Sequence, residues 1–258
     1  MTQKPEILSL SVALAALAFV VSPFLSDGFN GFTADQFPVP QTDPPVQPAG
    51  YAFSIWGVIY LWLLAGAGFG LLRRASDPDW AAMRLPLALS LAIGAAWIPV
   101  AQLSVLWATV MIWAMLATAL WALLRCGDGD GWWQRAPVAL YAGWLTAASC
   151  VSIGLVLAGF DILTPGLAAM AALCLALLIA LVMQGLRADV PLYTVAVIWA
   201  LVGVGVRNIA TPNWPVLVLT GAGIALLAWR GATLYARRGR LERADAGHTG
   251  DDRQEPAR

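Results

Sequence analysis

Eight apolar runs, separated by short polar segments, dominate this sequence. A helix that crosses the hydrocarbon core of a membrane needs about 20 predominantly apolar residues. The chain is 60% hydrophobic and 12% charged, whereas about 25% of the residues in a typical soluble domain are charged. We therefore predict an all-α protein, a polytopic bundle of eight transmembrane helices in lipid. The runs are Ile7–Leu25, Tyr51–Leu72, Leu85–Val105, Leu106–Leu124, Pro137–Gly159, Leu163–Leu186, Val190–Val206 and Trp214–Tyr235.

Hydropathy alone does not settle the boundary between the third and fourth runs or the nature of the first run. The third and fourth runs are nearly continuous, and one straight helix of about 40 residues would measure about 60 Å, twice the hydrocarbon thickness. We expect a break near the polar residues Gln102 and Ser104. The first run follows Lys4 and is either a signal peptide or a retained helix. Its length and the lack of an A-x-A cleavage pattern favour the retained helix.

The basic residues predict an orientation. If both termini are cytoplasmic, every Lys and Arg except Arg207 lies in a cytoplasmic segment, in agreement with the positive-inside rule. Removing any one span would scatter the arginines over both sides of the membrane. We predict an integral protein of a bacterial cytoplasmic membrane, with the N-terminus and the C-terminus inside.

Two polar segments adjoin the apolar runs. Residues 26–50 form a long outer loop that is rich in proline and has no Lys or Arg. Proline excludes regular helix and central strand, so we expect this loop to cap the outer mouth of the bundle. Residues 237–258 are charged and poor in apolar residues. They predict a disordered, polar cytoplasmic tail whose arginines lie near anionic lipid head groups.

The chain has thirteen tryptophans, more than an interfacial aromatic belt requires. Trp56, Trp97, Trp113, Trp144 and Trp199 lie deep in five different runs, where lipid offers no acceptor for an indole N–H. Either each indole packs between helices and donates to a backbone or hydroxyl oxygen, or several of them line a ligand pocket. Their spread over five runs favours a pocket that opens outward beneath the loop.

Several kinds of chemistry are disfavoured by composition. The net charge is zero, so nothing indicates a nucleic-acid partner. The single histidine, His248, lies in the polar tail, which excludes histidine ligation of a metal or haem in the apolar body. No ionisable residue lies deep in a run, which argues against ion-coupled transport. No nucleophile–base pair or carboxylate pair appears, so the sequence favours a non-enzymatic role and gives no catalytic residue.

Arg207 is the one basic residue on the predicted outer side. It either binds the carboxylate of an anionic ligand or extends to the outer lipid head groups.

The segment PAGYAFSIWGVIYLWL, residues 48–63, carries a resemblance to a known family. It resembles the entry to the second helix of the TspO/MBR family, also called translocator proteins or tryptophan-rich sensory proteins. In that family a Pro-Pro-Gly-aromatic hinge leads into Phe and then a pocket Trp. Pro48, Gly50, Tyr51, Phe53 and Trp56 match this order.

Two further segments carry the resemblance. In LAIGAAWIP, residues 91–99, Trp97 and Pro99 resemble the third-helix pattern of the family. In LYAGWLTAASCVS, residues 140–152, Tyr141, Trp144 and Ser149 resemble the fifth-helix pattern. There are also departures: Gly94 and Ser152 stand where the family has Asn, and Ile153 stands where some members have a second pocket Trp. These departures imply an altered pocket and argue against porphyrin degradation by a tryptophan pair.

The resemblance covers about residues 6–160 and implies a division of the chain. Residues 1–160 would form a five-helix TspO-like transmembrane core, and residues 161–236 would add three transmembrane helices. The resemblance further implies an outward-opening pocket for a flat hydrophobic ligand such as a tetrapyrrole or a sterol, a sensory, binding or transport role, and a homodimer as one assembly. We expect no cofactor apart from such a tetrapyrrole ligand. The site residues expected from this argument are Tyr51, Phe53, Trp56, Trp97, Tyr141, Trp144, Ser149 and Arg207.

Two alternatives stay open at this point. A facilitative transporter or channel for a small neutral solute would need a continuous polar path, and the spans carry only scattered hydroxyl and amide groups. A tetrapyrrole-modifying enzyme would need a reactive group of residues, which the sequence does not display.

The orientation is directly testable. We expect a reporter domain fused after Arg243 to be active only as a cytoplasmic reporter, because the arginines of the tail belong on the inside. Protease protection and reporter activity in intact cells measure this. A fusion that is exposed on the outside would overturn both the orientation and the even number of spans.

Overall fold

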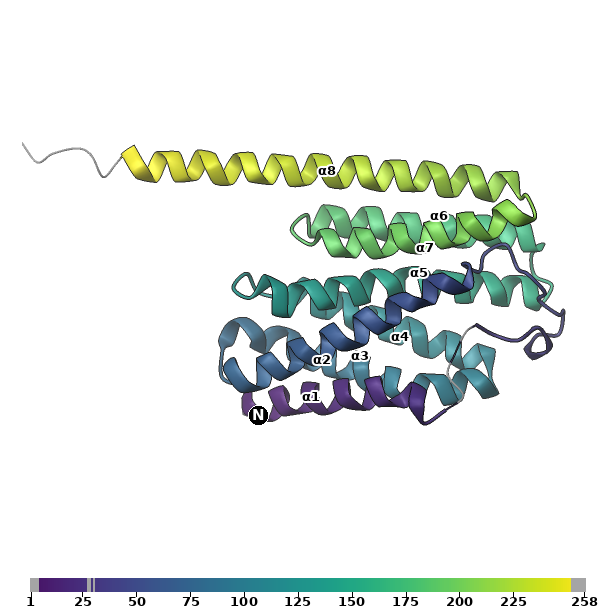
Figure 1. Ribbon diagram of the computed structural model, residues 1–258, viewed down its shortest axis with the longest axis horizontal. Helices are drawn as coiled ribbons and strands as arrows, with labels where there is room; N and C mark the ends of the chain where they lie inside the picture. Colours follow the sequence, from purple (N-terminus) through teal and green to yellow (C-terminus); the bar gives the residue numbers. More distant parts are fainter. Residues whose placement is uncertain (1–4, 27–28, 30, 252–258) are drawn as a thin grey trace, which may run out of the picture.

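The structure is a computed structural model that describes residues 5–26, 29 and 31–251 (Figure 1). In this part of the chain eight helices are long and apolar enough to cross a membrane, and no strand is present. The predicted all-α transmembrane class is therefore confirmed. The helices are α1 (Pro5–Val21), α2 (Ile55–Arg73), α3 (Pro78–Leu103), α4 (Val105–Arg125), α5 (Ala136–Gly159), α6 (Pro165–Leu186), α7 (Pro191–Ala210) and α8 (Trp214–Asp251).

The predicted break between the third and fourth helices falls at Ser104. This residue has an extended backbone, with φ −155° and ψ 114°, and its hydroxyl oxygen accepts a hydrogen bond from the backbone N–H of Trp107 at 3.3 Å. A serine in this position is a favourable N-cap. One polar residue thus ends α3 and starts α4, so that each helix has a length suited to the membrane.

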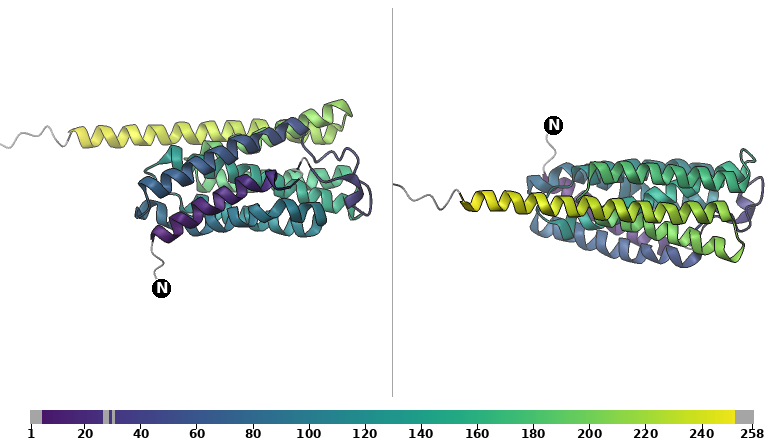
Figure 2. Two further views of the ribbon diagram at one scale, coloured as in Figure 1. Left: turned by 60° about the horizontal axis from the view of Figure 1, so that its bottom comes forward. Right: turned by 90° about the horizontal axis from the view of Figure 1, so that it is seen from above.

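The helices lie side by side, with α1 at one flank of the bundle and α8 at the other (Figures 1 and 2). The central helix is α5, which packs against α2, α4, α6 and α7 and is the most buried of the eight. Short connections join α3 to α4, α5 to α6 and α7 to α8 at one end of the bundle. We call this the strap end, after the segment that covers it, and the opposite end the arginine end.

Ion pairs join the loops at the arginine end. The guanidinium of Arg187 donates to Asp189 at 2.8 Å and to the carbonyl of Leu123 at 2.9 Å. Arg135 also donates to Asp189, at 2.8 Å. Burial disfavours the charged form of Asp189, but the hydrogen bonds and charge of Arg187, with the charge of Arg135, hold the pKa of its carboxyl at about 2. These contacts tie the α6–α7 loop to the ends of α4 and α5.

The C-terminal segment differs from the prediction of disorder after residue 236. α8 continues through Asp251, and residues 252–258 lie outside the described part of the chain. Extending an existing helix avoids the cost of nucleation, and residues 240–244 are Arg, Leu, Glu, Arg and Ala, which are good helix formers. A polar segment thus prolongs the last transmembrane helix.

Residues 31–49 cross the strap end between α1 and α2, and we call this segment the strap. It has no α-helix, only the 3-10 turn η2 (Ala34–Gln36). Three of its hydrogen bonds reach three different helices. The Gln36 amide donates to the carbonyl of Ala101 in α3 at 2.8 Å. The backbone N–H of Val39 donates to the carbonyl of Gly159 in α5 at 2.9 Å. The backbone N–H of Ala49 donates to a carbonyl of α7, that of Gly203, at 2.9 Å.

Polar side chains of α7 add to this attachment. Asn208 donates to the strap carbonyl of Pro45 at 2.8 Å, and Arg207 forms an ion pair with Asp43. Together with the backbone bonds, these contacts hold the second half of the strap against the end of α7.

Two apolar side chains of the strap insert into the bundle where α5 has glycine. Phe37 and Val46 expose 4% and 2% of their surface. A Cβ built on Gly159 would overlap the ring of Phe37, and one built on Gly154 would lie 2.9 Å from Cγ2 of Val46. The missing side chains of α5 therefore create the space in which the strap is seated.

We predict that Gly159→Ala lowers the melting temperature by several degrees, because the added methyl displaces Phe37 and overpacking costs about 1–3 kcal/mol. Gly221→Ala in α8 is the matched control, since a Cβ there meets nothing within 4 Å. In the absence of a clash, Gly→Ala in a helix stabilises by up to about 1 kcal/mol. Thermal unfolding in one detergent compares the two, and equal melting temperatures would contradict the seating of the strap on α5.

Candidate functional site

A cavity of about 390 Å³ lies beneath the strap, among helices α1 to α7. Each of these helices contributes to its wall, and so does the strap. The cavity is therefore a product of the whole bundle, and its residues come from segments far apart in the sequence. One lining residue from each helix, in chain order, is Phe19, Trp56, Trp97, Ile112, Trp144, Leu173 and Leu201.

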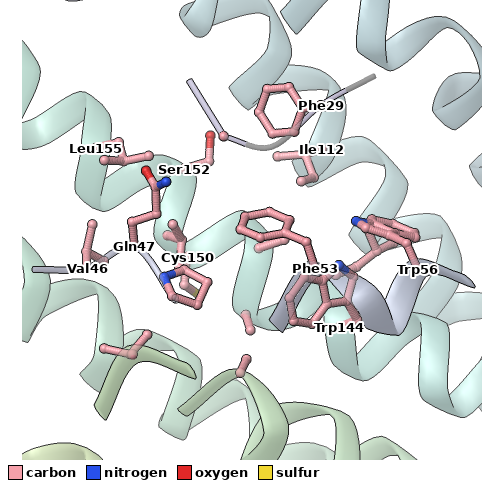
Figure 3. Close-up of a pocket in the computed structure, with 18 of the residues that line it drawn as sticks. Phe29, Val46, Gln47, Phe53, Trp56, Ile112, Trp144, Cys150, Ser152 and Leu155 are labelled. Atoms are coloured by element: carbon pink, nitrogen blue, oxygen red, sulfur yellow. The ribbon is translucent and has the colours of Figure 1, made fainter. Parts of the chain in front are cut away.

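Phe53, Trp56 and Trp144 lie together on one side of the cavity (Figure 3). With Tyr60, which also lines the cavity and stacks on Trp56, they form what we call the aromatic wall. Trp56 and Tyr60 are four residues apart on α2, so they share a helix face, and their rings stack at 5.2 Å with an interplanar angle of 18°. The Trp144 ring is edge-on to Trp56 at 6.1 Å and to Phe53 at 5.9 Å. Edge-to-face contacts of this kind fix ring orientation.

A second aromatic group lies on the α3 side of the cavity. The ring of Trp97 contacts Phe29 at 4.6 Å and Phe32 at 6.4 Å, both edge-on. Its indole N–H donates to the carbonyl of Ala108 in α4 at 2.8 Å. Trp97 thus joins α3 to α4, and its ring also contacts Phe29 and the strap residue Phe32.

Trp144 differs from the other deep tryptophans. It is 2% exposed, and its buried Nε1–H has no hydrogen-bond partner in the described part of the protein. By contrast, the indoles of Trp113 and Trp199 donate to the carbonyls of Ser149 and Ala52, at 3.1 and 2.9 Å. A buried donor without an acceptor costs about 1–3 kcal/mol. In Trp144 this unpaired indole N–H belongs to a residue that lines the cavity.

The remaining polar groups of the wall are uncharged. Gln47 of the strap, Ser54, Cys150 and Ser152 line the cavity, and Figure 3 shows Gln47, Cys150 and Ser152 on the side away from the aromatic wall. Of the residues that the structure describes, no Asp, Glu, Lys, Arg or His lines it. The cavity can offer a guest hydrogen bonds and ring contacts, but it has no fixed charge.

The structure brings five of the eight predicted site residues to the cavity: Tyr51, Phe53, Trp56, Trp97 and Trp144. The other three lie outside its lining. The hydroxyl of Tyr141 is hydrogen-bonded to Ser90 at 2.9 Å, and its ring packs against Phe19 behind the wall. Ser149 donates to the carbonyl of Ile112 at 3.2 Å. Arg207 is paired with Asp43 of the strap, as described above.

Sequence reasoning missed other parts of the wall. Tyr60 follows Trp56 by one helical turn, so helical periodicity could have identified it. Phe19 and Phe29 could not be placed without the tertiary structure. Small and aliphatic residues of α6 and α7 also line the cavity, beyond the predicted core boundary at residue 160, and nothing in their chemistry distinguishes them from ordinary helix packing; they are Ala172, Leu173, Ala176, Val197, Ala200, Leu201 and Val204.

The fold and the cavity define the class: an integral membrane protein with a helical bundle around an apolar, aromatic cavity near one end. A comparison with protein-family models matches residues 8–232 to the family described as TSPO-like protein, and the chain therefore belongs to that family. The matched range extends past residue 160 and includes α6, α7 and much of α8. Searches of curated proteins and of solved structures gave no match.

Proposed function

We propose that this TSPO-like membrane protein binds a flat hydrophobic molecule, sterol-like or tetrapyrrole-like, in the cavity beneath the strap and acts as a sensory or carrier protein for it. One observation carries the proposal: the buried indole N–H of Trp144, on the aromatic wall of an apolar cavity, has no partner within the described part of the protein. The nitrogen itself is not accessible from the cavity in this structure, so a ligand with a hydrogen-bond acceptor would supply that partner by shifting the Trp144 ring.

The energetics favour a guest of this kind. A volume of about 390 Å³ is within the range of about 300–1,000 Å³ that is usual for small-molecule sites. Apolar area removed from water contributes about 25 cal/mol per Å², and each ring contact with an indole adds about 0.5–1.5 kcal/mol. Family membership supports the same class of ligand, because the resemblance noted in the sequence implies tetrapyrrole or sterol binding.

The proposal predicts saturable quenching of tryptophan fluorescence when the protein in nanodiscs is titrated with a sterol, protoporphyrin or haem. Trp144→Phe keeps an aromatic ring but removes the N–H, so we expect at least one ligand to bind about tenfold more weakly, the equivalent of about 1.4 kcal/mol. Trp56→Leu removes the central ring of the wall and should weaken binding at least as much. Trp229→Phe is the matched control, because Trp229 is 66% exposed on α8.

The outcomes separate the alternatives. Absence of saturable quenching by every probe, or unchanged affinity in both Trp144→Phe and Trp56→Leu, would contradict the proposed function. Flux of a small neutral solute into liposomes without such quenching would favour a facilitative transporter. Chemical conversion of a probe would favour an enzyme.

A further inference from the structure

One face of α1 is buried against the bundle. Val12, Ala16 and Phe19 follow one another at helical spacing and are buried, whereas Leu14 and Leu17, on the other side of the helix, are about half exposed. Helix α1 packs against α2 and α3, so its buried face lies at the junction of these two helices. The last ring of this face, Phe19, is also part of the cavity wall.

Phe19 occupies space that a glycine on α3 leaves open. A Cβ built on Gly94 would lie 2.6 Å from Cε2 and 2.8 Å from Cδ2 of the Phe19 ring, and 3.0 Å from the terminal methyl of Met115. At such distances the ring and a side chain at position 94 exclude each other, because overpacking forces neighbouring groups to move. The missing side chain of α3 therefore admits a ring from α1 into the wall of the cavity.

Three aromatic neighbours hold the Phe19 ring in this orientation. Its centroid lies 5.8 Å from that of Trp56, 4.9 Å from that of Tyr60 and 5.7 Å from that of Tyr141, and all three contacts are edge-on. Edge-to-face pairs at these separations are favourable and directional. Phe19 is thus a fixed part of the wall, packed between Gly94 and the rings of α2 and α5.

Phe19 closes the inner end of the cavity, away from the strap. Ser90 lies four residues before Gly94 on α3, on the same helix face and one turn farther from the strap end. Its hydroxyl bonds to the carbonyl of Met115 at 2.8 Å and to the hydroxyl of Tyr141 at 2.9 Å. Neither Ser90 nor Tyr141 lines the cavity, although the Tyr141 ring contacts Phe19. The Phe19 ring therefore separates the cavity from this hydroxyl pair.

The two ends of the cavity are closed by different means. At the strap end Gln47 and Pro48 line it, in a segment that is hydrogen-bonded to several helices. At the inner end the boundary depends on one side chain, because Gly94 has none and the thioether of Met115 is flexible. Truncation of Phe19 would consequently extend the cavity toward Ser90 without removing a residue of the aromatic wall.

We infer that Phe19, seated on Gly94, determines the size of the ligand that the cavity accepts. This inference rests on the proposed function and narrows it: a compact ring system is favoured, and the same ring system with a long alkyl side chain is disfavoured. Phe19 acts as the inner boundary, and the aromatic wall provides the ring contacts.

A pair of ligands with one ring system tests the size limit. Cholestenone carries a long alkyl side chain, and the corresponding androstenone is the same ring ketone without it. Binding of each to the protein in nanodiscs is followed by tryptophan quenching, with affinities expressed relative to lipid. We expect the wild-type protein to favour androstenone, and Phe19→Ala to shift the ratio of the two affinities toward cholestenone by at least about fivefold. Phe24→Ala is the control, because Phe24 is exposed.

The ratio of affinities separates a size limit from a general loss of structure. A destabilised fold weakens both ligands alike, and partition into lipid is the same for every variant. Phe19→Leu covers the case in which the alanine variant is unstable, and should shift the ratio in the same direction. A smaller shift in Phe19→Ala than in the prediction, or a preference of the wild-type protein for cholestenone, would overturn the inference. Failure of both ketones to bind any variant would also overturn it, and the proposed function fails only if protoporphyrin and haem do not bind either.

A double-mutant cycle tests the pairing of Phe19 with Gly94. In the wild-type background Gly94→Ala displaces the Phe19 ring toward Trp56 and Tyr60, and we expect it to weaken androstenone binding by about fivefold or more. In the Phe19→Ala background the added methyl has room, and the same substitution should change the affinity by less than about twofold. Gly57→Ala on α2 is the matched control, since a Cβ there meets nothing within 4 Å. An equal effect of Gly94→Ala in both backgrounds would contradict the pairing.

Discussion

Lipid accepts no hydrogen bonds, so each polar hydrogen within a spanning helix needs an acceptor that belongs to the protein or to its guest. Three deep tryptophans of this protein, Trp97, Trp113 and Trp199, meet this requirement with backbone carbonyls of other elements. Trp144 does not, although it is the most central of the four, on the most buried helix. The same requirement that holds three indoles in place is thus unmet for the N–H of Trp144 within the described part of the protein, which is the basis of the proposed ligand site.

The bundle keeps space around that donor. Edge-to-face contacts hold Phe53 and Trp56 against Trp144, and glycines of α5 allow the strap to close over the cavity. The strap is held by backbone and side-chain hydrogen bonds and one ion pair. No charged side chain of the described residues lines the cavity. Enclosure and an apolar lining are consequences of one arrangement, in which α2 leans from α1 toward α7.

Much of this arrangement follows from sequence pattern, because hydropathy and helix length limit the possible folds. The eight helices and a break near Ser104 were predictable in this way, whereas the cavity-lining positions of Trp56 and Trp144 were expected from the family resemblance. Depth in a helix, however, does not reveal which side of the helix a residue occupies. Trp113 and Trp144 are equally deep, yet only Trp144 lines the cavity. The contact of Arg207 with Asp43, far apart in the chain, likewise depends on the path of the strap, and the helical continuation of α8 depends on the helix before it.

The central claim is that the Trp144 N–H is satisfied by a guest molecule. An experimental structure of the protein bound to a brominated sterol ketone, with the bromine located by anomalous scattering, tests it most directly. The account predicts bromine within the cavity, the ring system against Trp56 and Trp144, and the ketone oxygen about 3 Å from Nε1 of Trp144. Bromine found only on the lipid-facing surface, with that nitrogen donating to a backbone carbonyl, would contradict it.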